Sequence, residues 1–477
     1  MEDMNRRDFV IAAVGGLSLL SVETQPVQRG MHVRHNVYCL NPRGREIRSY
    51  ATAVTTMQAR PSTDPTSWSA QAAIHGTLAP IAGMIVSQCE HGTRFFLSWH
   101  RMFLYYFERI VRAASGDPAF GLPYWGYSPT GDRALPLPFR TPANPTNSLY
   151  VSNRRVAINA GTPINSSVVD AGVALSQLLF NPFSFTLEGT PHGVVHVAVG
   201  GLMGSVPTAG QDPIFWLHHA NIDRLWDVWI ASGSGRTNPS DAPWLTRSWD
   251  FYDETGARVS MTGSQVLDAA QQLRYRYAPD ACGQGVARGF DRQALRRLTR
   301  LPPDAHTLAF EDSLRRRPPR GEAMISAQTQ GPVSLGAAPA VAQLPISPEA
   351  RRLLATFLKD RAVGSGLVLA LEDVRAEGPV DVFYELYVNV PAGAKDTVHT
   401  GPYYLGNLDF FGAVEGSIQR QFNMVPVFRR LQALGAWAED TVRLTFVPRA
   451  FVEGEDPAKL LGQRTQGRVG RAVLRIE

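Results

Sequence analysis

Eleven histidines occur in the sequence, and most of them gather in two clusters whose spacing suits metal binding. In the second cluster His192 and His196 are four residues apart, so both imidazoles project from one helix face and can share one ion. A third histidine from another helix would complete a three-imidazole site with an open position, as catalytic metals need. The first cluster offers a second such set. The candidate ligands are His75, His91, His100, His192, His196 and one of the adjacent pair His218 and His219.

The donor set favours copper. Imidazole binds zinc, copper, iron or nickel. The run from His192 to His196 lacks the glutamate of the zinc-protease pattern His-Glu-x-x-His, which weakens a hydrolase interpretation. Two three-histidine sites without carboxylate ligands favour copper over harder metals. A single histidine is more simply explained as a structural residue, but six at these spacings predict metal binding.

Three helices are expected to position these side chains. An apolar stripe from His100 to Val111 recurs at helical spacing. Thr190-Pro191 predicts an N-cap and first-turn proline, and Gly200-Gly201 predicts the end of that helix. Asp212-Pro213 starts a third helix in the same way.

Two long motifs contain His91 and His100, and His218 and His219, respectively. Residues 89–108, CEHGTRFFLSWHRMFLYYFE, resemble the first copper signature of the tyrosinase, catechol oxidase and haemocyanin family, and residues 212–226, DPIFWLHHANIDRLW, resemble the second. The resemblance covers about residues 65–230 and implies a mainly α catalytic domain, a helix bundle holding a dicopper site between long loops. It implies the ligands His75, His91 and His100 for the first copper and His192, His196 and His219 for the second, with His218 supporting them.

The resemblance also implies roles for neighbouring residues. Cys89 stands two residues before His91, where some family members form a thioether to the histidine; a free buried thiol is the alternative. Phe215 matches an aromatic residue that packs near the metals. Val206 replaces a phenylalanine that gates the first copper in many plant members, so we expect that side to be more open.

Glu188 and Gly193 bear on the reaction type. Glu188 matches a family glutamate that holds an active-site water, with a helix-start acid as the alternative. Gly193 stands where tyrosinases often carry asparagine. Deprotonating a phenol, whose reference pKa is about 10, is harder without that amide.

The resemblance therefore implies oxidation of o-diphenols to o-quinones with O₂ as cosubstrate, and leaves hydroxylation of monophenols open. The substrate would be a small phenol. The alternative is a haemocyanin-like protein that binds oxygen without turnover and uses the same six histidines.

A second domain is expected from residue 347 to 477. A short helical pattern precedes four β-type runs bounded by Gly and Pro, at 367–374, 380–390, 442–448 and 469–476. Three segments within residues 380–449 resemble the C-terminal domain of plant polyphenol oxidases, which implies a β-sandwich that shields the copper site and keeps the enzyme latent. Residues 315–346 have linker composition, and their arginine-rich start at 315–320 is a candidate site for an activating protease.

The N-terminus predicts export. Arg6-Arg7 precede a short apolar run, and residues 1–27 resemble a twin-arginine signal for the periplasm or the extracellular space. The catalytic domain would then span 28–314. A net charge of +5 on 477 residues does not indicate nucleic-acid binding, and no later apolar run predicts stable membrane insertion. Three cysteines build no disulfide framework, and the sequence decides neither whether Cys39 and Cys282 pair nor the oligomeric state.

Overall fold

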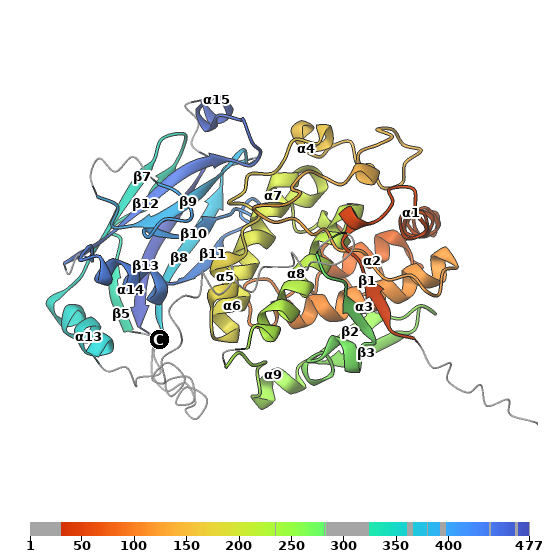
Figure 1. The fold of residues 1–477 in the computed structure, drawn as a ribbon, viewed down its shortest axis with the longest axis horizontal. Coiled ribbons are helices and arrows are strands. Elements are labelled where there is room, and N and C mark those ends of the chain that lie inside the picture. Colours follow the sequence, from red (N-terminus) through yellow and green to blue (C-terminus); the bar gives the residue numbers. More distant parts are fainter. Residues whose placement is uncertain are drawn as a thin grey trace, which may run out of the picture.

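The computed structural model describes residues 30–233, 235–280, 282, 324–359, 366–378, 380–391, 397–437, 440–462 and 466–476. The predicted export signal and the arginine-rich segment 315–320 lie outside these ranges and stay predictions. A helical domain and a sheet-rich C-terminal domain lie side by side (Figure 1). This confirms the predicted fold class. None of the described helices is both long and apolar enough to cross a membrane.

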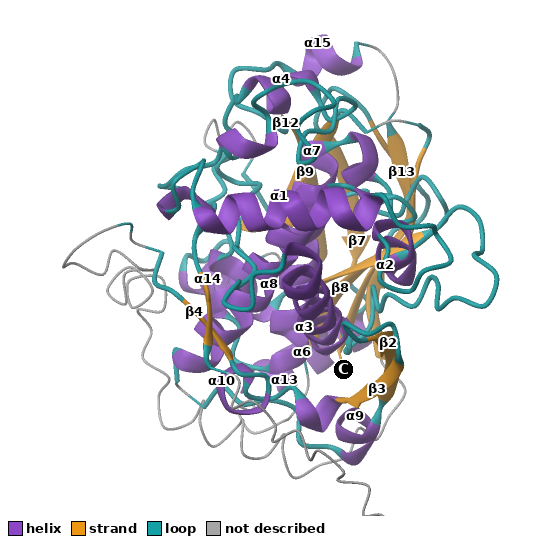
Figure 2. Ribbon diagram, turned by 90° about the vertical axis from the view of Figure 1, so that its right-hand side faces the viewer, coloured by secondary structure: helices purple, strands orange, loops and turns teal. Residues whose placement is uncertain are grey.

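The helical domain is built around two long helices that pack against each other in its core (Figure 2). Helix α3 (Phe96–Ser115) buries most of its residues, and α8 (Pro213–Ala231) is buried on nearly all sides. Asp212 caps α8 by accepting from the Ile214 amide, as its sequence predicts. The remaining helices of this domain are α1 (Arg45–Gln58), α2 (Trp68–His75), α4 (Val156–Ala160), α5 (Gly172–Ser176), α6 (Phe180–Leu187), α7 (Val194–Val199), α9 (Ala242–Thr246) and α10 (Ala269–Gln272).

A buried ion-pair network fixes α3 against α8. Arg101 of α3 pairs with Asp223 of α8, and its second nitrogen donates to Asp227 at 2.6 Å. Arg34 reaches the same Asp223 from strand β1 and also pairs with Glu108 at 2.7 Å. Strand β1 (His32–Arg34) pairs in parallel with β4 (Tyr275–Tyr277), and β2 (Ser248–Tyr252) forms a hairpin with β3 (Arg258–Thr262). Cys39 and Cys282 form a disulfide, which settles the pairing that the sequence leaves undecided.

The helix predicted to start at Thr190 differs in the structure. Helix α6 continues into a π-helical turn, η3 (Glu188–Gly193), which runs on into α7. Thr190 has extended backbone angles, φ −132° and ψ 123°, so it marks a kink inside a longer helical segment. The predicted end is confirmed, because Gly200 follows α7 with a φ of 69°, which favours glycine.

The C-terminal domain packs two mainly antiparallel sheets face to face. One sheet has the order β10-β9-β12-β7 and the other β11-β8-β13-β5, with β6 also pairing β13. Leu369, Leu386 and Leu444 belong to the apolar core between them. The strands are β5 (Met324–Gln328), β6 (Val333–Leu335), β7 (Ala340–Pro345), β8 (Leu367–Ala376), β9 (Val382–Val388), β10 (Tyr404–Leu408), β11 (Ile418–Asn423), β12 (Thr441–Ala450) and β13 (Gly467–Ile476), and the helices are α13 (Pro348–Lys359), α14 (Val425–Ala433) and α15 (Pro457–Leu461).

The predicted linker 315–346 is wrong over 324–345, because β5, β6 and β7 lie there. Strand β7 alternates inward and outward, with Ala342 and Leu344 buried, and it pairs with β12 at the edge of its sheet. Only these two residues face inward, so the strand has little apolar signal of its own and is stabilised by the neighbouring strand. The domain therefore begins well before the predicted residue 347.

Helices α5, α6 and α7 face the sheet domain (Figure 1). Strand β10 packs against η3, and β11 packs against α6. Polar contacts also join the two domains: Arg133 pairs with Glu453 at 2.6 Å, and Asn407 donates to the Ser167 carbonyl at 2.9 Å. The rings of Phe383, Phe411 and Phe451 from the C-terminal domain join the apolar core of the helical domain.

Candidate metal centre

The first histidine cluster comes from a helix end, a loop and a long helix. His75 is the last residue of α2, His91 lies on the following loop, and His100 lies on α3. Their ring centroids are 5.1 Å (His75 to His91), 5.3 Å (His91 to His100) and 5.7 Å (His75 to His100) apart. Ser67 begins α2 by accepting from the Ala70 amide, and Gly76 ends it. Gly76 is needed there because a Cβ would lie 2.9 Å from the Pro207 Cα.

The second cluster joins the kinked helical segment to α8. His192 lies in η3, His196 in α7 and His219 in α8. The ring centroids of His192 are 4.7 Å from His196 and 5.0 Å from His219, and those of His196 and His219 are 5.2 Å apart. The two clusters adjoin, since His100 stacks on His219 with centroids 4.5 Å apart. The structure therefore brings all six sequence-predicted ligands into one buried place.

Backbone carbonyls hold four of the six rings. The Nδ1 atoms lie 3.1 Å from the Val206 carbonyl (His75), 2.8 Å from that of Phe96 (His100), 2.9 Å from that of Glu188 (His192) and 2.9 Å from that of Met203 (His196). Since a carbonyl only accepts, each Nδ1 carries the proton and each Nε2 keeps its lone pair. Metal-binding histidines are commonly oriented by such a contact on the other ring nitrogen.

The Nε2 atoms fit a metal. Those of His75, His91, His100 and His192 are buried and have no hydrogen-bond partner among the described residues. Burial lowers the pKa of His75 to about 4, and burial together with neighbouring imidazoles lowers the pKa values of the other five well below 6.5. The rings are thus neutral, as ligands must be. Unpartnered nitrogens of this kind are costly unless something binds them, and a metal ion satisfies that need.

His218 and His219 both lie within reach of the second cluster. The possible ligand atoms of His192, His196, His218 and His219 fall within 4.8 Å of one another. His219 also groups with His75 and His100, so it lies between the clusters. The Nδ1 of His218 is 2.9 Å from the Tyr127 hydroxyl, a contact that the sequence does not predict. His218 therefore lies close to the second cluster, with its Nδ1 at the Tyr127 hydroxyl, whereas His219 lies between the two clusters.

Cys89 lies beside His91. Its Sγ is 3.5 Å from Nδ1 of that ring, and the thiol is otherwise free. Burial and nearby carboxylates raise the pKa of the thiol to about 12, so it stays protonated at neutral pH. The sulfur therefore lies next to the imidazole to which the family resemblance predicts a thioether.

Glu188 connects the two clusters. Its Oε1 accepts from the Gly92 amide at 2.6 Å, next to His91, while its backbone carbonyl holds His192. Its Oε2 is buried without a hydrogen-bond partner in the described part of the chain. Burial raises the pKa of the carboxyl to about 7, although Arg420 of the C-terminal domain lowers it in part. A buried acceptor of this kind can take up a proton near neutral pH.

Phe215 and Val206 line the first cluster. The Phe215 ring lies 4.9 Å from His75 and 4.2 Å from His219 between centroids, so it packs near both clusters. Val206 orients His75 through its carbonyl, and its side chain lies beside Gly412 of the C-terminal domain. The side expected to be open at Val206 is thus next to the second domain in this structure.

Phe411 of the C-terminal domain covers the histidines and is not identified by the sequence reasoning. Its ring centroid lies 5.5 Å from His91 and 5.6 Å from His192. It stands in the stretch Gly401–Gly412, and its double phenylalanine before glycine is the only local signal. Gly193 faces the same segment, because Asp409 lies against it.

Comparisons with known proteins agree with this architecture. The common central domain of tyrosinase matches residues 65–170 and 140–232, the polyphenol oxidase middle domain matches 238–282, and a domain model of unknown function matches 322–460. A tyrosinase of Hahella sp. is 37% identical over 305 residues, which are 52% of this chain and 64% of that protein. A chloroplastic polyphenol oxidase of Malus domestica is 26% identical over 84% of this chain and 72% of its own length. The chain therefore spans just under two thirds of the Hahella relative.

Solved structures show the same fold. A latent aurone synthase (polyphenol oxidase) matches with a TM-score of 0.64 at 21% identity, covering 95% of this chain and 90% of that one. The latent apple tyrosinase matches with a TM-score of 0.63 at 22% identity, covering 95% and 98%.

A helical domain with two adjoining groups of buried histidines, joined to a sheet domain, fits the type-3 copper proteins. The chain belongs to the tyrosinase and polyphenol oxidase family, and it carries a C-terminal domain like that of the latent members.

Proposed function

We propose that this chain is a polyphenol oxidase that converts o-diphenols to o-quinones with O₂ and two copper ions. The observation that supports it best is the set of six adjoining imidazoles, five buried and that of His91 half-buried, of which four are held by carbonyls with their Nε2 atoms turned away. His75, His91 and His100 would hold one ion, and His192, His196 and His219 the other. Bound there, the copper pair would supply two-electron redox chemistry with O₂, by which a catechol loses two electrons and two protons.

Side chains near the histidines would deprotonate the phenol and exclude water from it. Glu188 takes a proton from the phenolic hydroxyl, directly or through a water, because its free Oε2 is a buried acceptor with a pKa of about 7. Phe215 gives the site an apolar wall that excludes water from the rings. Gly193 offers no amide to assist Glu188, so diphenol oxidation is favoured over hydroxylation of monophenols.

Latency is part of this proposal. Phe411 fills the place above His91, His192 and His196 where a phenol ring would approach the metals. Substrate access then requires removal or displacement of the C-terminal domain. Cleavage in the arginine-rich segment 315–320, between the domains, would let it leave.

Oxygen uptake by the copper-loaded chain tests the proposal. We expect little uptake with catechol before protease treatment, a marked rise after it, and a weaker response to tyrosine. Metal analysis should give two coppers per chain. Reversible O₂ binding without quinone formation after cleavage would instead support the oxygen-carrying alternative, and bound zinc would contradict both.

A further inference from the structure

The lack of a side chain at Gly193 leaves room for a residue of the C-terminal domain. Its backbone angles are φ −63° and ψ −39°, which any residue adopts, so the conformation does not require glycine. A Cβ at this position would lie 2.7 Å from Cγ and 3.1 Å from Oδ2 of Asp409. Real Cβ atoms are not found so close to a carboxylate carbon. The Asp409 carboxylate occupies the place that a side chain of residue 193 would take.

Asp409 is too constrained to turn aside. Its side chain is fully buried, and Arg420 donates to it twice, from Nε to Oδ2 at 2.7 Å and from Nη2 to Oδ1 at 2.7 Å. The Phe411 amide donates to the same Oδ1 at 3.0 Å, and Arg420 also donates to the Phe411 carbonyl at 2.9 Å. A displaced Asp409 would therefore move Phe411 with it.

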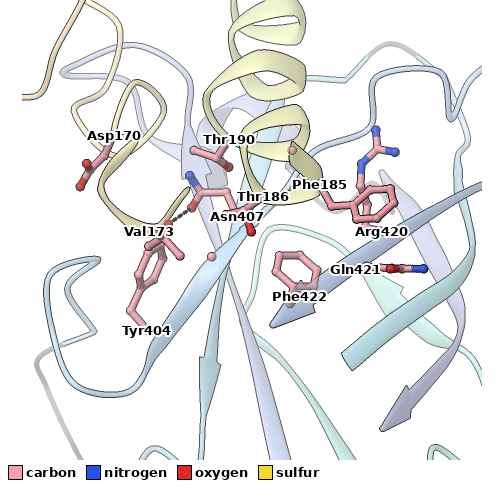
Figure 3. A pocket seen from close by; sticks show the side chains of 12 residues that line it. Asp170, Val173, Phe185, Thr186, Thr190, Tyr404, Asn407, Arg420, Gln421 and Phe422 are labelled. Carbon is pink, nitrogen blue, oxygen red and sulfur yellow. Dashed lines mark hydrogen bonds between the residues drawn. The ribbon is translucent and has the colours of Figure 1, made fainter. Parts of the chain in front are cut away.

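The surroundings leave little room for such a movement. Arg420, Asn407 and Phe422 of the sheet domain lie next to the helical turn that carries Thr186 and Thr190 (Figure 3). The cavity there is lined by Arg420 but by neither Gly193 nor Asp409, and it measures about 20 Å³, so Arg420 has room beside it for about one water. Arg420 is half-buried and interacts with both Asp409 and Glu188, so separating it from Asp409 would leave the fully buried Asp409 carboxylate unpaired.

We propose that Gly193 is the docking notch for the C-terminal domain, and that any side chain there releases Phe411 from the histidines without proteolysis. Asp409 and Arg420 are then positioning residues that hold the covering ring in place. This inference rests on the proposed function for its activity readout. It assigns Gly193 a role in latency that is separate from the reaction type.

Gly189 provides a matched control. It lies in the same π-helical turn, and a Cβ there would meet Asp409 only at 3.9 Å, an ordinary contact. Gly193→Ala and Gly189→Ala therefore add the same methyl group to the same turn, and only the first collides with Asp409.

The test uses the full, uncleaved chain. We expect copper-loaded Gly193→Ala to oxidise catechol about tenfold faster than wild type, which corresponds to about 1.4 kcal/mol of lost docking, with Gly189→Ala close to wild type. Amide hydrogen exchange on the copper-free proteins gives a second readout. Residues 404–412 should exchange faster in Gly193→Ala alone, while α3 and α8 stay protected and thus report a folded helical domain.

The outcomes separate the two ideas. If Gly193→Ala is as latent as wild type and equally protected at 404–412, the docking notch is refuted. If no variant oxidises catechol even after protease treatment, the proposed function fails, while the exchange of residues 404–412 still decides the docking role. Loss of protection throughout α3 and α8 would show general unfolding and would also count against a local notch.

Discussion

Phe411 stacks on His196 with ring centroids 4.1 Å apart and planes inclined by 14°. The two residues belong to different domains, and the ring lies nearly parallel to a proposed copper ligand. A phenol that approached the second cluster would meet this aromatic side chain first. The contact therefore connects the position of the C-terminal domain to access to the histidines.

Phe411→Ala should activate the uncleaved protein. Burying a phenylalanine side chain is worth about 2 kcal/mol, so its loss weakens docking and also uncovers the histidines. We expect the catechol oxidation rate of the full chain to rise at least about tenfold, measured by oxygen uptake. Phe411→Leu keeps an apolar side chain over His196 and should remain nearly latent. An alanine variant as slow as wild type would contradict the covering role.

Glu188→Gln should remove a pH dependence. The Glu188 carboxyl has a pKa of about 7, so it is protonated below that pH and accepts a proton above it. We expect the rate of protease-treated wild type to rise with pH as Glu188 loses its proton, and the glutamine variant to be slower by about 10²-fold without that rise. Glu90→Gln is the control, since the Glu90 carboxylate accepts a hydrogen bond from Trp249 Nε1 at 2.8 Å. A similar profile in Glu188→Gln would exclude Glu188 as the base.

The same substitution has a consequence for stability. The folded pKa lies above the ordinary value of 4.5, so the folded chain holds the proton more tightly. Stability from this group is therefore complete below about pH 4.5 and is lost as pH rises to about 7, by roughly 3 kcal/mol at most. Unfolding of the copper-free protein in denaturant should show this slope in wild type and not in Glu188→Gln.

The sequence could predict the candidate ligands and, through its resemblance, a shielding domain, but not which residue of that domain covers the histidines. His91, His100 and His219 lie within the two long motifs, and His192 and His196 are indicated by their spacing of four residues. His75 lies outside both motifs, and only the family resemblance assigns it. Phe411 and Asp409 gain their roles only through contact between domains, which no local pattern encodes. Strand β7 has no strong local signal because only Ala342 and Leu344 face inward, and its stability depends on pairing with β12.

Cys89 should be found bonded to the His91 ring. The Sγ already lies 3.5 Å from Nδ1, which places it beside the adjacent ring carbon. In protein purified with copper and exposed to O₂, we expect the peptide that spans both residues to be lighter by two hydrogens, as mass spectrometry would show. Cys89→Ser should lack this difference and retain copper up to about tenfold less tightly. A full-mass wild-type peptide would mean a free thiol.

Asp223→Asn should loosen the metal centre from a distance. Asp223 forms ion pairs with Arg101 of α3 and Arg34 of β1, and it lies on the same helix as His219. Breaking a buried ion pair costs about 3–5 kcal/mol, so we expect a lower unfolding midpoint and fewer coppers per chain. Asp250→Asn is the control, because its pair with Arg258 is exposed and worth less than about 1 kcal/mol. Equal effects of the two variants would contradict the positioning role.

Gly193→Asn should change the reaction as well as the docking. The family resemblance implies that the asparagine amide helps Glu188 to deprotonate a monophenol, while the Cβ would collide with Asp409 as that of alanine does. We therefore expect the full-length variant to be open and, in addition, to show a higher ratio of tyrosine to catechol oxidation than Gly193→Ala. Measuring both substrates on the two variants separates the amide from the added carbon. If both variants give the same ratio, the amide plays no part and Gly193 matters only for docking.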